Sequence, residues 1–167
     1  LIISGGNEIL DNHSDKEIKE DSFLKAVGIR NENELKLIKK YISASKPIFG
    51  ICHGLQIINH YFGGKLKLLN SNNHINNEHT IKLINDNFKD FFNSDKFFVN
   101  SYHNYVIDVL GQNLEVIALS NDGVIEAIGN KEEKIFAIMW HPERPFSDEI
   151  SSDFNCRIIN NYMSFIK

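Results

Sequence analysis

One cysteine of the chain lies in a sequence context that suits a reactive thiol. Cys52 belongs to the sequence GICHG, so Gly50 and Gly54 stand two residues to either side of it. An apolar run at 47–51 precedes the cysteine, and an amphipathic stretch at 53–62 follows it. A sharp strand-to-helix turn crowds the positions two before and two after its central residue, so glycine fits there and side chains do not. This pattern indicates a nucleophile elbow.

The chemistry expected of such an elbow is covalent catalysis by the Cys52 thiolate. The first amide N–H groups of the following helix point at the sulfur, where they lower the thiol pKa and can bind a developing oxyanion. The alternative is a structural cysteine packed in the core, which is common in proteins. A nucleophile also requires a base, so the histidines decide between the two interpretations.

His141 is the histidine that the sequence favours as this base. It follows a strongly apolar run at 134–140, and active sites of α/β proteins gather at the carboxyl ends of their strands. Pro142 disfavours a helical conformation at His141. In an extended segment His141 and Glu143 project to the same side, so Glu143 can accept a hydrogen bond from the imidazole and fix its tautomer. Cys52, His141 and Glu143 therefore form a candidate catalytic triad.

Alternating strands and helices must position these side chains. The hydrophobic patterns predict strands at 1–4, 47–51, 79–84, 96–100, 114–120, 123–129 and 134–140, and helices at 31–45, 53–62 and 148–166. Asn31 or Asn33 is the expected cap of the first helix. This order predicts an α/β fold with a mixed sheet covered by helices on both faces, in one domain over residues 1–167. Because the chain opens directly on a buried strand, we expect further sheet neighbours upstream of Leu1.

The composition excludes several other classes of protein. The formal net charge of −4, without a Lys/Arg cluster, argues against nucleic acid as a partner. No apolar run reaches membrane-spanning length. Cys52 and Cys156 are the two cysteines and form no disulfide framework, which favours a reducing, cytoplasmic compartment.

His74 and His79 could ligate a metal, but their polar, Asn-rich surroundings favour a solvated loop, and we predict no metal site or cofactor. Cys156 is expected in the core.

The order of the motifs resembles a known family. The stretches SGG, PIFGICHGLQIINHYFGGKL, NSYHNYVI, DGVIEAI and MWHPE occur as in class I glutamine amidotransferase-like proteins, and are most similar to the γ-glutamyl hydrolase (peptidase C26-like) branch. The resemblance implies a flavodoxin-like three-layer sandwich around a mixed, mostly parallel sheet, preceded by a strand–helix–strand unit. It also implies cleavage of γ-glutamyl amide bonds through a γ-glutamyl thioester. Residues 100–128 and 135–144 are especially similar to bacterial hydrolases of γ-glutamyl-CDP-amidate, which act in capsular phosphoramidate biosynthesis.

The resemblance also assigns roles to individual residues. It implies a triad of Cys52, His141 and Glu143 and an oxyanion hole made of two backbone amides. The resemblance implies that the backbone amides of Gly6 and His53 form that hole. It implies that the glutamyl group is contacted by Gln56, Ser101, Tyr102 and His103. Glu126 belongs to a family motif and receives no catalytic step. The residues expected to border the leaving group are His53, Met139 and Arg144.

Three functions from different classes are compatible with these residues. The first is a free-standing hydrolase of a small-molecule γ-glutamyl amide. The second is a glutaminase subunit that delivers ammonia to a separate synthase partner. The third is a binding module that has kept the fold without catalysis, against which the intact Cys52, His141 and Glu143 argue. The sequence does not define the leaving group or the oligomeric state.

Overall fold

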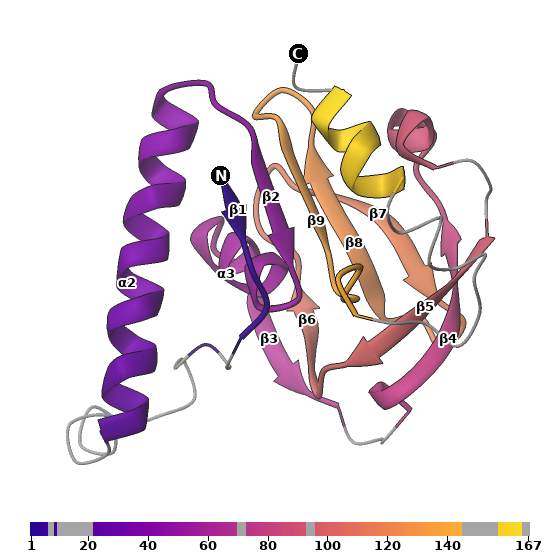
Figure 1. Cartoon of the computed structure of the whole chain (residues 1–167), viewed down its shortest axis with the longest axis horizontal. Helices are drawn as coiled ribbons and strands as arrows, with labels where there is room; N and C mark the ends of the chain where they lie inside the picture. The colour runs from indigo at the N-terminus through magenta and orange to yellow at the C-terminus, as the bar shows by residue number, and fades with distance from the viewer. Residues whose placement is uncertain (7–8, 10–21, 70–72, 93–95, 145–156, 165–167) are drawn as a thin grey trace.

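A computed structural model describes residues 1–6, 9, 22–69, 73–92, 96–144 and 157–164. Its main feature is a seven-stranded sheet in the order β1-β2-β9-β8-β7-β4-β5. Helices cover both faces of this sheet, as Figure 1 shows. The long helix α2 (Ser22–Ser43) and the shorter α3 (His53–Tyr61) lie on one side, and the helix at 157–164 lies on the other.

The first three strands of the sheet are parallel, and they carry the motifs of interest. β1 (Ile2–Ile3) pairs with β2 (Ile48–Ile51), and β2 pairs with β9 (Ile135–Ile138). All positions of β2 and β9 are buried, as expected for parallel strands that are covered on both faces. The carboxyl ends of β1, β2 and β9 therefore meet at one edge of the sheet.

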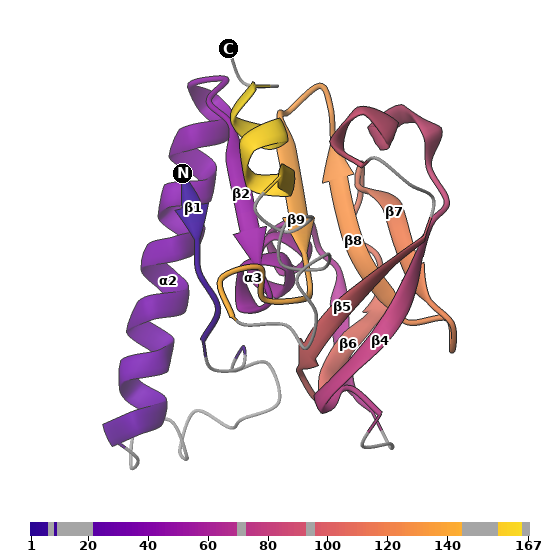
Figure 2. The ribbon, with the colours of Figure 1, turned by 45° about the vertical axis from the view of Figure 1, so that its right-hand side comes forward.

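The remaining strands of the sheet pair in antiparallel fashion. They are β8 (Ile125–Asn130), β7 (Glu115–Ser120), β4 (Ile75–Leu83) and β5 (Lys96–Tyr102). β3 (Lys65–Leu68) and β6 (Tyr105–Val109) form a separate two-stranded sheet, and a 3₁₀ helix, η2 (Asp86–Phe91), connects β4 to β5. Figure 2 shows β4 and β5 running obliquely across the end of the sheet.

Two hydrophobic clusters, one on each face, hold the layers together. Along β9 and the two residues after it, side chains alternate between the clusters: Ile135, Ala137 and Met139 join one, whereas Phe136, Ile138 and Trp140 join the other. The first cluster includes Leu55, Ile57 and Ile58 of α3, and the second includes Ile158 and Tyr162 of the helix at 157–164. This alternation is the period of two expected for a strand buried on both faces, and it confirms the predicted three-layer α/β fold.

The predicted elements differ from the observed ones mainly at their ends. α2 begins at Ser22, nine residues before the predicted helix start, so Asn31 is a buried residue inside the helix and not its cap. β4 begins at Ile75, within the stretch that we predicted to be a loop. The short elements β3, η2 and β6 were not predicted. Of the predicted helix at 148–166, residues 148–156, including Cys156, lie outside the described residues.

Candidate active site

Cys52 occupies a sharp turn between β2 and α3. Its backbone has φ 50° and ψ −102°, a positive φ that non-glycine residues seldom adopt. A Cβ atom on Gly50 would lie 2.7 Å from the backbone carbon of Gly54, and one on Gly54 would collide with the carbonyl oxygen of Ile3. The two glycines thus allow strand, turn and helix to pack this closely. The predicted elbow geometry is present around the cysteine.

The environment of the Cys52 sulfur favours the neutral thiol. Burial raises the pKa of the Cys52 thiol to about 11, although the His53 backbone N–H donates a hydrogen bond to the sulfur and Arg144 adds a favourable positive charge. The negative charges of Glu126 and Glu143 raise the pKa further. The sequence-based expectation of a lowered pKa was therefore wrong, because desolvation of the thiolate outweighs the amide and the arginine.

Parallel pairing brings the Cys52 turn, the loop after β1 and the segment after β9 together. The Cys52 N–H donates to the Ile138 carbonyl of β9 over 2.8 Å. On the other side, a Cβ atom on Gly5 would lie 2.5 Å from Cε1 of His141, so the imidazole packs directly against the Gly5 backbone. Since β2 lies between β1 and β9 in the sheet, the contact between Gly5 and His141 passes over the end of the strand that carries Cys52.

The candidate base is fixed on several sides. His141 Nδ1 lies 2.6 Å from Oε1 of Glu143, which indicates that Nδ1 carries a proton and that Nε2 is the nitrogen left for chemistry. The buried Asn100 side chain holds the His141 backbone with two hydrogen bonds of 2.9 Å, one to its N–H and one to its carbonyl. The Tyr102 ring meets the imidazole edge to face, with 5.7 Å between centroids. Asn100 was not among the predicted site residues, although it is the first residue of the NSYHN motif.

A second group of side chains connects α2 to the same turn. Glu34 accepts hydrogen bonds from Arg30 Nε over 2.8 Å and from His53 Nε2 over 2.7 Å. Arg30 also donates to the carbonyls of Ser4 and Gly5. Burial would raise the pKa of Glu34, but the hydrogen bonds and charges of His53 and Arg30 lower it below 4.5. This bridge of Arg30, Glu34 and His53 was not predicted, because nothing in the sequence indicates its pairing across elements.

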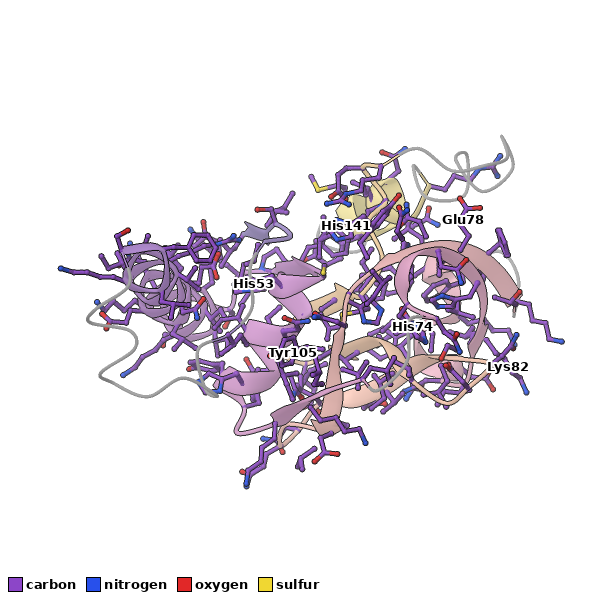
Figure 3. The ribbon with its side chains drawn as sticks, turned by 90° about the horizontal axis from the view of Figure 1, so that it is seen from below. His53, His74, Glu78, Lys82, Tyr105 and His141 are labelled. Carbon is purple, nitrogen blue, oxygen red and sulfur yellow. The ribbon has the colours of Figure 1, made fainter. Side chains whose placement is uncertain are left out.

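The other predicted site residues lie around this centre in different roles. Gly6 continues the loop after β1 and packs against the Arg30 guanidinium. The Gln56 amide, on α3, lies 3.5 Å from the Tyr105 carbonyl. The fully buried Ser101 hydroxyl donates to the His74 carbonyl over 2.8 Å. Figure 3 shows His53, Tyr105 and His141 in this part of the molecule.

Of the three residues expected to border the leaving group, only Arg144 is exposed. Met139 is fully buried in the core, and the His53 side chain is 1% exposed and bonded to Glu34. Neither side chain faces open space, so the prediction that Met139 and His53 border the leaving group was wrong. The Arg144 guanidinium lies 4.2 Å above the Tyr102 ring, beside the candidate base.

The prediction that His74 and His79 belong to a solvated loop was also wrong. His74 is 2% exposed and His79 is partly buried, and both face the carboxylate of Glu126, as does His103. Glu126 itself is fully buried. Burial would raise the pKa of Glu126, but the adjacent imidazoles of His103, His74 and His79 hold it well below its ordinary range. Of these three contacts, the one from His79 Nε2 to Oε1 is a hydrogen bond of 3.0 Å.

Comparisons with known proteins agree with this fold and motif order. A profile of the Peptidase C26 family matches residues 1–143. The glutamine amidotransferase-like protein YvdE of Lactococcus lactis is 40% identical over 72% of this chain and 56% of its own length. The gamma-glutamyl-CDP-amidate hydrolase of Campylobacter jejuni is 34% identical over the whole chain and 70% of its own length. Among solved structures, a glutamine amidotransferase of Thermotoga maritima has a TM-score of 0.66 at 19% identity, covering 98% of this chain and 62% of that one.

The chain belongs to the Peptidase C26 family, with a class I glutamine amidotransferase-like fold. It spans about half the length of the Lactococcus relative. None of the helices in the described ranges is both long and apolar enough to cross a membrane.

Proposed function

We propose that this chain is a cysteine-dependent hydrolase of γ-glutamyl amide bonds, with Cys52 as nucleophile, His141 as acid and base, and Glu143 as the residue that orients His141. The observation that carries the proposal is the meeting of three strand ends: the strained Cys52 turn lies on the central strand, and the pair of His141 and Glu143 packs across it against Gly5. Membership of the Peptidase C26 family supports the same chemistry.

The raised pKa of Cys52 defines how the first step proceeds. Because the thiol is neutral at pH 7, its proton passes to His141 Nε2 as the sulfur attacks the γ-carbonyl carbon. The His53 N–H, which contacts the sulfur, and the Gly6 N–H hold the oxyanion, where losing one donor costs roughly 10²–10³ in turnover. His141 then protonates the leaving nitrogen, the C–N bond breaks, and a γ-glutamyl thioester remains.

Water completes the cycle at the same base. Neutral His141 takes a proton from water as the oxygen attacks the thioester carbonyl, the C–S bond breaks, and glutamate and the thiol are released. Glu143 accepts the Nδ1 hydrogen bond throughout and stabilises the imidazolium without taking its proton. Gln56 and Tyr102 are proposed to contact the bound glutamyl group, and Ser101 to hold this segment through its bond to the His74 carbonyl. The buried His103 ring faces the Tyr105 carbonyl and Glu126 instead, so we assign it no contact with the substrate.

The proposed substrate carries a large, anionic leaving group, as γ-glutamyl-CDP-amidate does. Two observations support this class: the similarity to the Campylobacter hydrolase, and the exposed guanidinium of Arg144 next to Tyr102. A guanidinium can bind a phosphate through two parallel hydrogen bonds. The competing proposal is a glutaminase subunit, for which the leaving group is ammonia and a synthase partner is required.

Glutamate release from a panel of γ-glutamyl compounds tests both proposals. We expect a γ-glutamyl nucleotide conjugate to have a higher kcat/KM than glutamine, and Arg144→Ala to reduce kcat/KM for the conjugate far more than for glutamine. Arg144→Lys serves as the control, because it keeps the charge and loses the bidentate geometry. A clear preference for glutamine that increases when a synthase is added would favour the glutaminase proposal. Equal losses on both substrates would exclude Arg144 from leaving-group recognition.

A further inference from the structure

Three imidazole rings and one carboxylate converge at a place that the catalytic proposal does not use. His74 precedes β4, His79 lies within it, His103 follows β5, and Glu126 lies on β8. Oε1 of Glu126 is 3.2 Å from His74 Nδ1, 3.0 Å from His79 Nε2 and 3.5 Å from His103 Nε2. β8 is not a sheet neighbour of β4 or β5, and both of these strands run obliquely across the end of the sheet (Figure 2).

We propose that His74, His79, His103 and Glu126 form a binding site for a divalent first-row transition metal ion, with Zn²⁺ as the best match. Imidazole nitrogen and carboxylate oxygen are ligands that zinc prefers, and structural zinc sites take four of them in a tetrahedron. Ligand atoms at about 2.0–2.1 Å from a tetrahedral zinc ion lie about 3.3 Å from one another. The three separations from Glu126 Oε1 lie close to that value. The ligand atoms of His74, His79 and Glu126 all lie within 4.8 Å of one another, so these three residues form the inner group and His103 is the fourth, outer ligand.

The far nitrogens of two of these rings support this assignment independently. Histidines that bind metals commonly donate their other ring N–H to a carboxylate or a backbone carbonyl, which fixes the tautomer and the ring orientation. His74 Nε2 lies 3.1 Å from an Asp122 carboxylate oxygen, and His103 Nδ1 lies 3.2 Å from the Tyr105 carbonyl. Both acceptors require a proton on the far nitrogen, so the near nitrogen of each ring can present a lone pair to the centre of the cluster.

Several polar atoms of the cluster lack the hydrogen bonds that burial demands. His74 Nδ1, His103 Nε2 and the second oxygen of Glu126, Oε2, are buried without a hydrogen-bond partner of good geometry. An unpaired buried polar group costs on the order of 1–3 kcal/mol, and a buried carboxylate needs a compensating positive charge. One divalent ion would bind both ring nitrogens and the carboxylate at once.

The site also has a route to solvent. A hollow of about 250 Å³ opens onto His74, His79 and Asp122. Figure 3 shows His74 on the inner side of the curled strand β4, with Lys82 on the outer side. Because His103 follows Tyr102 directly, an ion bound here would hold the segment that packs against His141.

Metal binding to the whole purified chain tests the proposal. After treatment with a chelator, the protein is titrated with Zn²⁺ or Co²⁺, and binding is followed by metal content after dialysis and by the visible bands of tetrahedral Co²⁺. The titration uses Cys52→Ala, so that binding between the nucleophile and His141 cannot contribute. We expect one equivalent to bind, with Co²⁺ bands that show nitrogen and oxygen ligands and no sulfur.

Variants locate the ion. In the same background His79→Ala should abolish the Co²⁺ bands, and Asp122→Asn should weaken Zn²⁺ binding by roughly 10–100-fold through the ring that it orients. The control is His60→Ala, which removes a histidine of α3 outside the cluster. Absence of Co²⁺ bands in the parent protein would overturn the proposal and leave a hydrogen-bonded network of imidazoles and carboxylates only. Bands that survive His79→Ala, or an unchanged Zn²⁺ affinity of Asp122→Asn, would equally overturn it. Asp122 is 43% exposed, so its variant keeps the test valid if His79→Ala does not fold.

Discussion

Cys52 illustrates how burial and catalysis oppose each other at a single residue. The turn that presents the thiol also removes it from water, and desolvation raises its pKa to about 11 despite the His53 amide and the Arg144 charge. A thiol in this state is protected from adventitious oxidation and needs a base at the moment of attack. This explains why the orientation of His141 is controlled by Asn100, Glu143 and Gly5 together.

The first prediction concerns the ionisation of Cys52 in the free protein. Its alkylation rate should rise about tenfold per pH unit from pH 7 and level off only near pH 11, since the thiolate fraction follows the pKa. Arg144→Ala should move the curve to higher pH, because the guanidinium stabilises the thiolate. The assay is labelling with a neutral alkylating reagent followed by peptide mass analysis. A plateau below pH 8 would show that the thiolate is already stable and would refute the raised pKa.

The second prediction separates the base from the residue that orients it. His141→Ala should reduce kcat by roughly 10²–10⁴, the usual contribution of general acid–base catalysis. Glu143→Gln should cost less, because the Gln carbonyl can still accept the Nδ1 hydrogen bond and the Glu143 side chain is 50% exposed, so water partly replaces its charge. Steady-state kinetics of both variants on one γ-glutamyl substrate provide the comparison. If Glu143→Gln is the more damaging change, the two roles are assigned incorrectly.

At this scale the sequence predicted best the residues whose roles depend on near neighbours. Cys52 with its two glycines, and His141 with Glu143, form local patterns that can be read directly. The Asn100 side chain contacts the backbone of a residue 41 positions away, and His74 and His79 lie in an Asn-rich stretch that masks their importance. Contacts of this kind depend on the fold and leave no local signal.

Among the elements, α2 is attached to the active-site turn by more than hydrophobic packing. Glu34 joins Arg30 on its own helix to His53 at the start of α3, and Arg30 reaches the Ser4 and Gly5 carbonyls. One carboxylate therefore fixes the long helix relative to both the Cys52 turn and the loop that carries Gly6. We infer that this bridge keeps the two proposed oxyanion donors in register.

The third prediction measures this bridge. Glu34→Gln leaves His53, which is 1% exposed, without its anionic partner and should lower the free energy of unfolding at pH 7 by about 1–3 kcal/mol. The pKa of Glu34 is lower in the folded state than its ordinary 4.5, so its contribution is full above pH 4.5 and is lost as the pH falls through the folded value. Urea unfolding of both proteins between pH 7 and 3 should show the difference shrinking.

The control on the same helix is Glu32→Gln. Glu32 pairs with Lys36 over 3.7 Å, and both side chains are more than 70% exposed, so we expect little change in the free energy of unfolding. Equal effects of Glu32→Gln and Glu34→Gln would show that Glu34 contributes only as a surface charge. A difference that grows as the pH falls would contradict the direction of the Glu34 pKa shift.

The element boundaries show where hydrophobic periodicity fails. Phe23 and Ile29 of α2 are more than half exposed, so the first part of this helix lacks the apolar stripe that marks 31–45. The Asn-rich start of β4 has low strand propensity and is held by its pairing with β5. By contrast, β2 and β9 are buried on both faces and produce continuous apolar runs, which made them predictable from the sequence.

For the molecule as a whole, one sheet serves two purposes. Its parallel strands β1, β2 and β9 present the proposed catalytic residues at their carboxyl ends, and its antiparallel strands curl so that the cluster around Glu126 forms close by. The sequence predicted the mixed sheet with helices on both faces from the order of its elements. It did not predict the curl of the sheet, which depends on bulges and strand twist that no local pattern specifies.

The fourth prediction concerns the assignment of residues 1–167 to a single domain. Trp140 is the only tryptophan and is fully buried in the cluster between the sheet and the helix at 157–164. Its fluorescence and the far-ultraviolet circular dichroism should therefore report one coincident, cooperative unfolding transition in urea. Transitions with clearly different midpoints would divide the chain into independently folding parts.

The central claim, that Cys52 attacks the γ-carbonyl group, is tested most directly by mapping a covalent γ-glutamyl label. The protein is inactivated with a γ-glutamyl electrophile, digested, and its peptides are identified by mass spectrometry. Cys156 serves as an internal control, because it is the only other thiol of the chain. We predict stoichiometric labelling of Cys52 that parallels the loss of glutamate release, blocked by substrate and absent in Cys52→Ala. Full inactivation with the label on Cys156, or on another residue while Cys52 stays unmodified, would contradict the claim.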